Sequence, residues 1–139
     1  MATDDNLQNL MTKVAEQLLR RTLAGDISWA ETDKEDDYLY SGSDSSASIY
    51  FSRRSGSVRG RYVLTVFNSR GTRIEELRSD YVRTNEGVIE EAGWNGVLSE
   101  LHEAARRNAL DIEGVLDDLI AELSKEQKTN SQGGGETSE

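Results

Sequence analysis

The chain contains no cysteine. Disulfide bonds therefore cannot stabilise the fold, and neither thiol chemistry nor a cysteine-rich zinc site is available, which fits a reducing compartment. The first ten residues are acidic and lack the basic region and apolar run of a secretory signal, and no segment approaches the ~18 consecutive apolar residues of a membrane span. We therefore expect a cytoplasmic protein that does not enter a membrane.

Patterns typical of catalytic and cofactor-binding sites are also missing. His102 is the only histidine, with no second imidazole or thiol at metal-ligand spacing, so we interpret it as a solvent-facing or partly packed helix residue. The serines of segment 41–57 show no nucleophile-elbow pattern, and no glycine-rich phosphate loop occurs. Adjacent acids such as Asp36 and Asp37 point in different directions. The sequence thus predicts no enzyme, no cofactor and no metal site.

The length and composition favour a single folded unit. The chain has 139 residues, of which 35% are hydrophobic and 30% are charged, and one domain typically takes ~100–150 residues. We expect one α+β domain over residues 1–124. Residues 125–139 contain no apolar side chain that could offset the entropy of ordering, so we expect a disordered polar tail there.

Apolar residues at helical spacing predict three helices. The first spans roughly 5–24 and ends near Gly25, a residue type suited to a helix C-terminus. The second begins around Trp94 and stops near Asn108. The third is capped by Asp111 and carries an apolar stripe formed by Ile112, Val115, Leu116, Leu119, Ile120 and Leu123. We expect the two C-terminal helices to close the fold, with Trp29 and Trp94 as core anchors.

Alternating patterns predict an antiparallel sheet. Segments 47–52 and 62–67 read as neighbouring strands, and the second has two apolar faces, so it should be central. Segment 72–77 follows a short turn, and Ile74 and Leu77 break its alternation as a β-bulge would. The expected fold is a three- or four-stranded meander covered by an N-terminal helix and two C-terminal helices.

A local motif joins the first helix to the sheet. Residues 18–32 contain G-x-I-x-W-x-x-T at Gly25, Ile27, Trp29 and Thr32, and the strands are followed by A-R-R-x-A-L and an acidic amphipathic helix. In this the chain resembles a type of small bacterial α+β protein. The resemblance spans nearly all of the folded residues and implies this fold and a bacterial or phage origin, with the four motif residues holding the helix-to-sheet joint. It carries no catalytic assignment.

The net charge of −10 conceals a basic middle. Segment 53–83 holds eight arginines against three acids, a local charge of +5, so the remaining residues carry −15. Clustered arginines suit a phosphate backbone. They also pair readily with acidic helices of the same or a neighbouring molecule, and we favour that second interpretation.

These patterns lead to a binding function. If the helices cover only one face of the sheet, the other remains available for contacts. The candidate interaction surface consists of Tyr50, Arg59, Arg61, Val63, Thr65, Phe67 and Arg73. We predict a non-catalytic protein-interaction module, an adaptor or regulator, that self-associates as a homodimer. The alternatives are nucleic-acid binding through segment 53–83, or an acidic inhibitor that mimics a nucleic-acid backbone.

Overall fold

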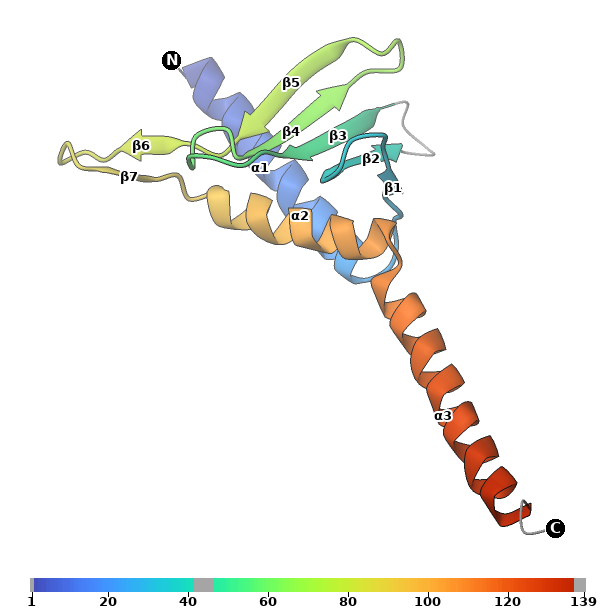
Figure 1. The fold of residues 1–139 in the computed structure, drawn as a ribbon. Coiled ribbons are helices and arrows are strands. Elements are labelled where there is room, and N and C mark those ends of the chain that lie inside the picture. The colour runs from blue at the N-terminus through green and yellow to red at the C-terminus, as the bar shows by residue number, and fades with distance from the viewer. Residues whose placement is uncertain (1, 42–46, 137–139) are drawn as a thin grey trace.

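The computed structural model describes residues 2–41 and 47–136, and within them helices flank a run of strands (Figure 1). The order of elements is α1 (Ala2–Leu23), β1 (Ala30–Glu31), β2 (Asp37–Ser41), β3 (Ser48–Arg53), β4 (Tyr62–Phe67), β5 (Arg73–Arg78), β6 (Tyr81–Arg83), β7 (Ile89–Glu91), α2 (Asn95–Ala109) and α3 (Ile112–Glu136). The α+β class is therefore confirmed.

The main sheet is an antiparallel meander in the order β1-β2-β3-β4-β5, and β6 pairs with β7 in a separate hairpin. The meander is as predicted, and β4 is paired on both sides. The strand number differs from the three or four expected. β1 has only two residues, and β6 and β7 have three each, so their alternation is too short to be recognised in the sequence.

A register shift between β4 and β5 confirms the bulge. Val66 is opposite Glu75 while Phe67 is opposite Arg73, so Ile74 is the additional residue on β5. An additional residue reverses which side chains share a face beyond it. Arg73 therefore lies beside Glu76, with its Nη1 3.0 Å from Glu76 Oε1.

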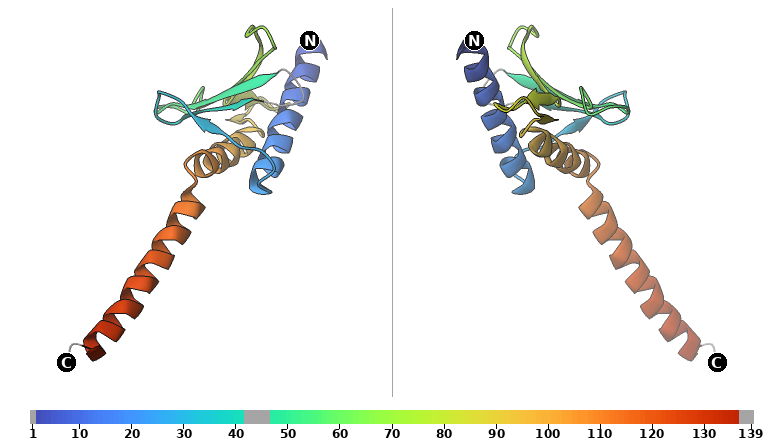
Figure 2. Two further views of the ribbon diagram at one scale, coloured as in Figure 1. Left: turned by 90° about the vertical axis from the view of Figure 1, so that its right-hand side faces the viewer. Right: turned by 90° about the vertical axis from the view of Figure 1, so that its left-hand side faces the viewer.

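Helices α1 and α2 pack against the same face of the sheet (Figure 2). Each helix contributes apolar side chains at helical spacing, and the strands contribute the alternate residues that face them. The resulting core contains Met11, Ala15, Leu18, Trp29, Tyr38, Ile49, Phe51, Leu64, Leu77, Leu98, Leu101 and Ala105. The opposite face of the sheet carries neither α1 nor α2.

The joint between α1 and the sheet is held by side-chain hydrogen bonds. Gly25 adopts φ 78°, which ends α1 as expected. Trp29 is buried, as predicted for a core anchor, and its Nε1–H donates to Thr22 Oγ1 over 2.9 Å. Asn108 lies inside α2, one residue before its end, and its Nδ2–H donates to the Ile27 carbonyl over 3.1 Å. Asn108 therefore anchors the segment that joins α1 to the sheet.

Helix α3 departs from the expected arrangement. It extends away from the sheet and the other helices, so the prediction that both C-terminal helices cover the sheet is wrong for α3 (Figures 1 and 2). Only Leu110 and Asp111 connect it to α2, and Asp111 has φ 51°, which turns the chain outward. The helix continues to Glu136, and the disordered tail expected for residues 125–139 stays a prediction.

None of the helices in ranges 2–41 and 47–136 combines the length and hydropathy that crossing a bilayer requires.

Candidate interaction surfaces

The face of the sheet opposite α1 and α2 brings together most of the predicted surface. Cross-strand rows place Tyr50 beside Thr65, and Phe67 opposite Arg73, with Val63 on the same face. We call this the open sheet face. Val63 and Thr65 are only 8% and 9% exposed, since longer neighbouring side chains surround them. The open sheet face therefore offers little apolar area to a partner.

Polar contacts reinforce the open sheet face. The Tyr50 hydroxyl donates to Asp37 Oδ2 over 2.8 Å, and burial, assisted by this bond, raises the pKa of Tyr50. Glu76 accepts from both neighbouring arginines, with Arg73 Nη1 at 3.0 Å and Arg78 Nε at 3.1 Å. A partner that binds through these charged groups would have to compete with the ion pairs they already form.

Arg59 and Arg61 lie away from the open sheet face, in the loop that precedes β4. Arg59 Nε is 2.8 Å from Asp80 Oδ1, and its guanidinium lies over the Tyr81 ring at 5.8 Å from the centroid. The Tyr81 backbone N–H is the largest cause of a lowered pKa of Asp80, and Arg59 lowers it further. Arg61 donates to the Gly56 carbonyl over 2.8 Å. The seven residues of the predicted interaction surface therefore lie in two separate regions.

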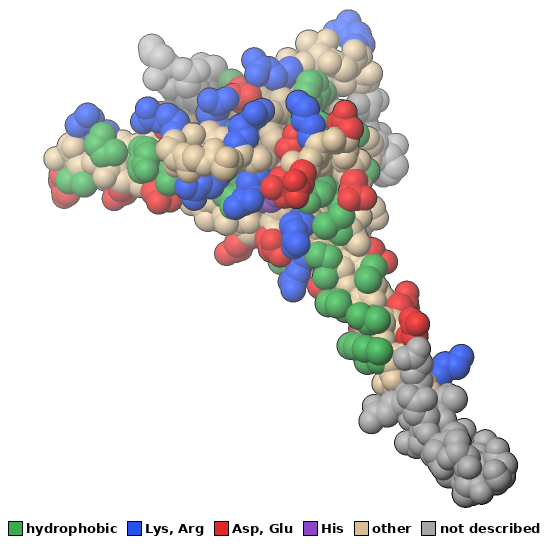
Figure 3. Space-filling model, viewed as in Figure 1, with side chains coloured by type: hydrophobic (Ala, Val, Ile, Leu, Met, Phe, Trp, Pro, Cys, Tyr) green, Lys and Arg blue, Asp and Glu red, His purple; other side chains and the backbone are tan. Residues whose placement is uncertain are grey.

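The basic segment pairs with acids of its own chain. Figure 3 shows Lys and Arg side chains gathered over the sheet on the side away from α1, with acidic groups among them. Arg53 pairs with Asp36 at 3.5 Å. In addition, Arg59 pairs with Asp80, and Arg73 and Arg78 both pair with Glu76. These acids belong to strands and loops, whereas the sequence favoured acidic helices as partners.

His102 is a core residue. It is 3% exposed, against the expectation of a solvent-facing or partly packed side chain, and its ring lies 5.2–5.5 Å from those of Tyr38, Phe51 and Tyr62. Its Nε2–H donates to the Asp36 carbonyl over 2.7 Å. Burial lowers the pKa of His102, which the bond to Asp36 opposes. In the described ranges no cluster of three potential metal-ligating side chains occurs.

Helix α3 carries an extended exposed apolar feature. Its stripe recurs at helical spacing, as predicted, but the side chains face solvent, and Figure 3 shows a row of hydrophobic groups along the helix. We call this the α3 stripe. The exposed fractions are 57% for Val115, 51% for Leu116, 46% for Leu119, 61% for Ile120 and 54% for Leu123. The sequence identified these residues and wrongly assigned them to cover the sheet.

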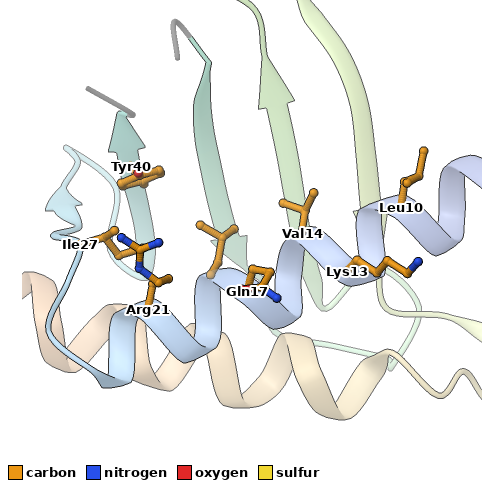
Figure 4. A pocket seen from close by; sticks show the side chains of 8 residues that line it. Leu10, Lys13, Val14, Gln17, Arg21, Ile27 and Tyr40 are labelled. Carbon is orange, nitrogen blue, oxygen red and sulfur yellow. The ribbon is translucent and has the colours of Figure 1, made fainter. Parts of the chain in front are cut away.

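A groove between α1 and the sheet is another apolar feature, and sequence reasoning missed it. Its volume is about 440 Å³. Figure 4 shows Leu10 and Val14 projecting from α1 beside the strands, with Ile27 and Tyr40 at the other end. We call this the α1 groove; it is lined by Leu10, Lys13, Val14, Gln17, Leu18, Arg21, Ile27 and Tyr40. The sequence gives one indication of the groove. Helix α1 carries the apolar residues Leu10 and Val14 in addition to those that it buries in the core.

Comparison of the chain with protein-family models, curated proteins and solved structures gave no match in any of the three.

Proposed function

We propose that the protein is a non-catalytic interaction module, an adaptor or regulator, that self-associates through the α3 stripe. The observation that carries this proposal is a row of five apolar side chains, each 46–61% exposed, on a helix that extends away from the body of the fold. Contiguous apolar patches on soluble proteins commonly mark interaction sites.

The energetics of an isolated helix support the same conclusion. Most helical stability in proteins comes from packing of an apolar face, and a lone helix in water is marginal. Full burial of an aliphatic side chain contributes about 1.5–3 kcal/mol, so covering the five half-exposed residues of the stripe provides on the order of 5 kcal/mol per helix. Part of this offsets the entropy lost on association.

The open sheet face supports the proposal less well than α3 does. Val63 and Thr65 are nearly buried, and Arg73 is paired with Glu76. A contact there would gain little apolar burial and would disturb an ion pair. We therefore place the self-association contact on α3.

Light scattering of the purified chain over a range of concentrations tests this function. We expect a dimer, and we expect Leu119→Glu to dissociate it because a carboxylate would enter the apolar contact. The matched control is Ala121→Glu, which adds the same charge on the opposite side of α3, and it should remain dimeric. Circular dichroism confirms that both variants keep their helices. A wild-type monomer at every concentration would contradict the proposal.

A second candidate function is nucleic-acid binding, which is favoured by the gathering of basic side chains over the sheet (Figure 3). Four arginines of segment 53–83 are engaged with carboxylates of the same chain, and this reduces the charge available for phosphates. Phosphate contacts would make binding strongly salt-dependent. Fluorescence anisotropy with single-stranded and duplex oligonucleotides at two salt concentrations tests this candidate.

A further inference from the structure

The α3 stripe and the α1 groove match in length. Along α1, the groove extends from Leu10 to Arg21, which corresponds to ~16 Å at the helical rise per residue. The stripe extends from Val115 to Leu123, ~12 Å by the same measure. A helix with the dimensions of α3 can therefore place its whole apolar stripe along the groove.

The volume of the groove suits several aliphatic side chains. A cavity of ~150 Å³ accommodates one benzene-sized group, and the groove has about 440 Å³. It thus has room for roughly three side chains of the size of leucine. Leu116, Leu119 and Leu123 lie along the centre of the stripe at spacings of three and four residues, so they present such a set from one side of a helix.

The charged residues around the α1 groove and the α3 stripe are complementary as well. Lys13 and Arg21 line the groove on the α1 side, and Arg21 Nε also lies 3.2 Å from Asp26 Oδ2, so Lys13 is the cation with no such pair there among the described residues. Each edge of the α3 stripe carries two acids, since helical spacing places Glu113 with Asp117 on one edge and Asp118 with Glu122 on the other. Whichever edge of α3 faces α1, acidic groups approach the basic ones. The polar rim around an apolar contact is typical of protein interfaces.

The connection to α2 directs α3 away from its own groove. Asp111 N–H donates to the Asn108 carbonyl over 3.2 Å, and Val115 N–H donates to the Asp111 carbonyl over 2.9 Å. Arg107 Nε lies 3.9 Å from Glu113 Oε2, across the turn between the helices. These contacts span the two-residue connection, beyond which the helix diverges from the body (Figures 1 and 2).

From these observations we infer that the occupant of the α1 groove is the α3 helix of a second copy of this chain. This inference rests on the proposed self-association and specifies its receptor. Two copies exchange their α3 helices, so that each apolar stripe enters the groove of the other and the contact forms twice about a two-fold axis. The α3 stripe and the α1 groove are then buried against each other.

A complementation experiment tests reciprocal exchange. Val14→Glu blocks the groove and Leu119→Glu blocks the stripe, so each variant alone is expected to be monomeric. An equimolar mixture retains one intact contact between the stripe of the first and the groove of the second. Native mass spectrometry of isotopically distinguished chains should therefore detect heterodimers that dissociate at higher concentration than the wild-type dimer does. Asn9→Glu, an exposed position of α1 outside the groove, is the matched control and should remain dimeric.

The variants separate this inference from the proposed function. If Val14→Glu stays dimeric while Leu119→Glu dissociates, α3 packs against α3, and the inference is overturned while self-association stands. If the wild-type chain is monomeric, the proposed self-association is wrong, and the inference that rests on it is wrong as well.

The absence of cysteine permits a second, independent measurement. Chains carrying Val14→Cys or Leu119→Cys contain a single thiol each, and a short bismaleimide should link the two variants when they are mixed. It should link neither variant to itself. Efficient linking of Leu119→Cys to itself would indicate α3–α3 packing. In the double variant Val14→Cys/Leu119→Cys, a link within one chain would show that α3 occupies its own groove. Either result would overturn the inference.

Discussion

Trp29 donates its backbone N–H to the side-chain oxygen of Asn108 over 2.7 Å, although the two residues are 79 positions apart in the chain. The amide nitrogen of the same asparagine donates to the Ile27 carbonyl. One side chain near the end of α2 thus satisfies two backbone groups of the segment that leads into the sheet. This clamp closes the fold around the buried Trp29 ring.

Replacing Asn108 by leucine should destabilise the fold. The substitution keeps the approximate size of the side chain and leaves the Trp29 N–H and the Ile27 carbonyl without partners. Each unsatisfied buried group costs ~1–3 kcal/mol, so we expect the free energy of unfolding to fall by about 2–4 kcal/mol. Urea denaturation measures the change. Asn9→Leu, at an exposed position on α1, should change it by less than about 0.5 kcal/mol.

His102 should make the fold less stable at mildly acidic pH. Burial lowers the pKa of His102 in the folded state, so the unfolded chain binds the proton more readily. The stabilising contribution is complete above the unfolded pKa of ~6.5 and is lost progressively as the pH falls below it. Because this is the only histidine, its NMR titration reports the folded pKa directly.

The corresponding control is His102→Phe. Its free energy of unfolding should change less between pH 7.5 and pH 5.5 than that of the wild-type chain. Equal pH dependence in the two proteins would contradict the assignment of this effect to His102.

Phe67→Glu should leave the oligomeric state unchanged. Phe67 lies on the open sheet face opposite Arg73, away from both α3 and the α1 groove. The new carboxylate gains a basic cross-strand neighbour, so the effect on stability should be below about 1 kcal/mol. Light scattering measures the mass. Dissociation of the dimer without unfolding would return the contact to the open sheet face that the sequence favoured.

Removal of α3 should separate folding from association. The core lies between Met11 and Ala109, so a chain ended after Asp111 keeps all of it. We expect this shortened protein to melt cooperatively within a few degrees of the wild-type monomer and to remain monomeric at every concentration. Calorimetry and light scattering provide the two readouts. A shortened chain that still forms dimers would place the contact elsewhere.

Neutralising basic residues should distinguish the two candidate functions. Arg73→Gln and Arg78→Gln remove charge from the open sheet face and release Glu76. We expect no change in dimer dissociation, because neither residue lies in the groove or on α3. If the protein binds oligonucleotides, the two variants should weaken that binding and reduce its salt dependence.

Sequence patterns predicted most elements because helices and strands depend on neighbouring residues. The spacing of Leu10, Val14 and Leu18 indicates α1, and the alternation in 62–67 indicates β4. The predicted surface was less accurate. Arg59 and Arg61 were placed on one candidate surface with Val63, but β4 begins only at Tyr62, and both arginines lie in the preceding loop with contacts of their own.

The sequence by itself determined the periodicity of the helices and strands, the apolar stripe of α3, the bulge on β5 and the lack of thiol chemistry. Tertiary structure decided that His102 is buried, that Asn108 binds the Trp29 segment, and that α3 points away from the α1 groove of its own chain. These properties depend on contacts between distant residues and on the backbone dihedrals of Leu110 and Asp111, which a local pattern does not encode.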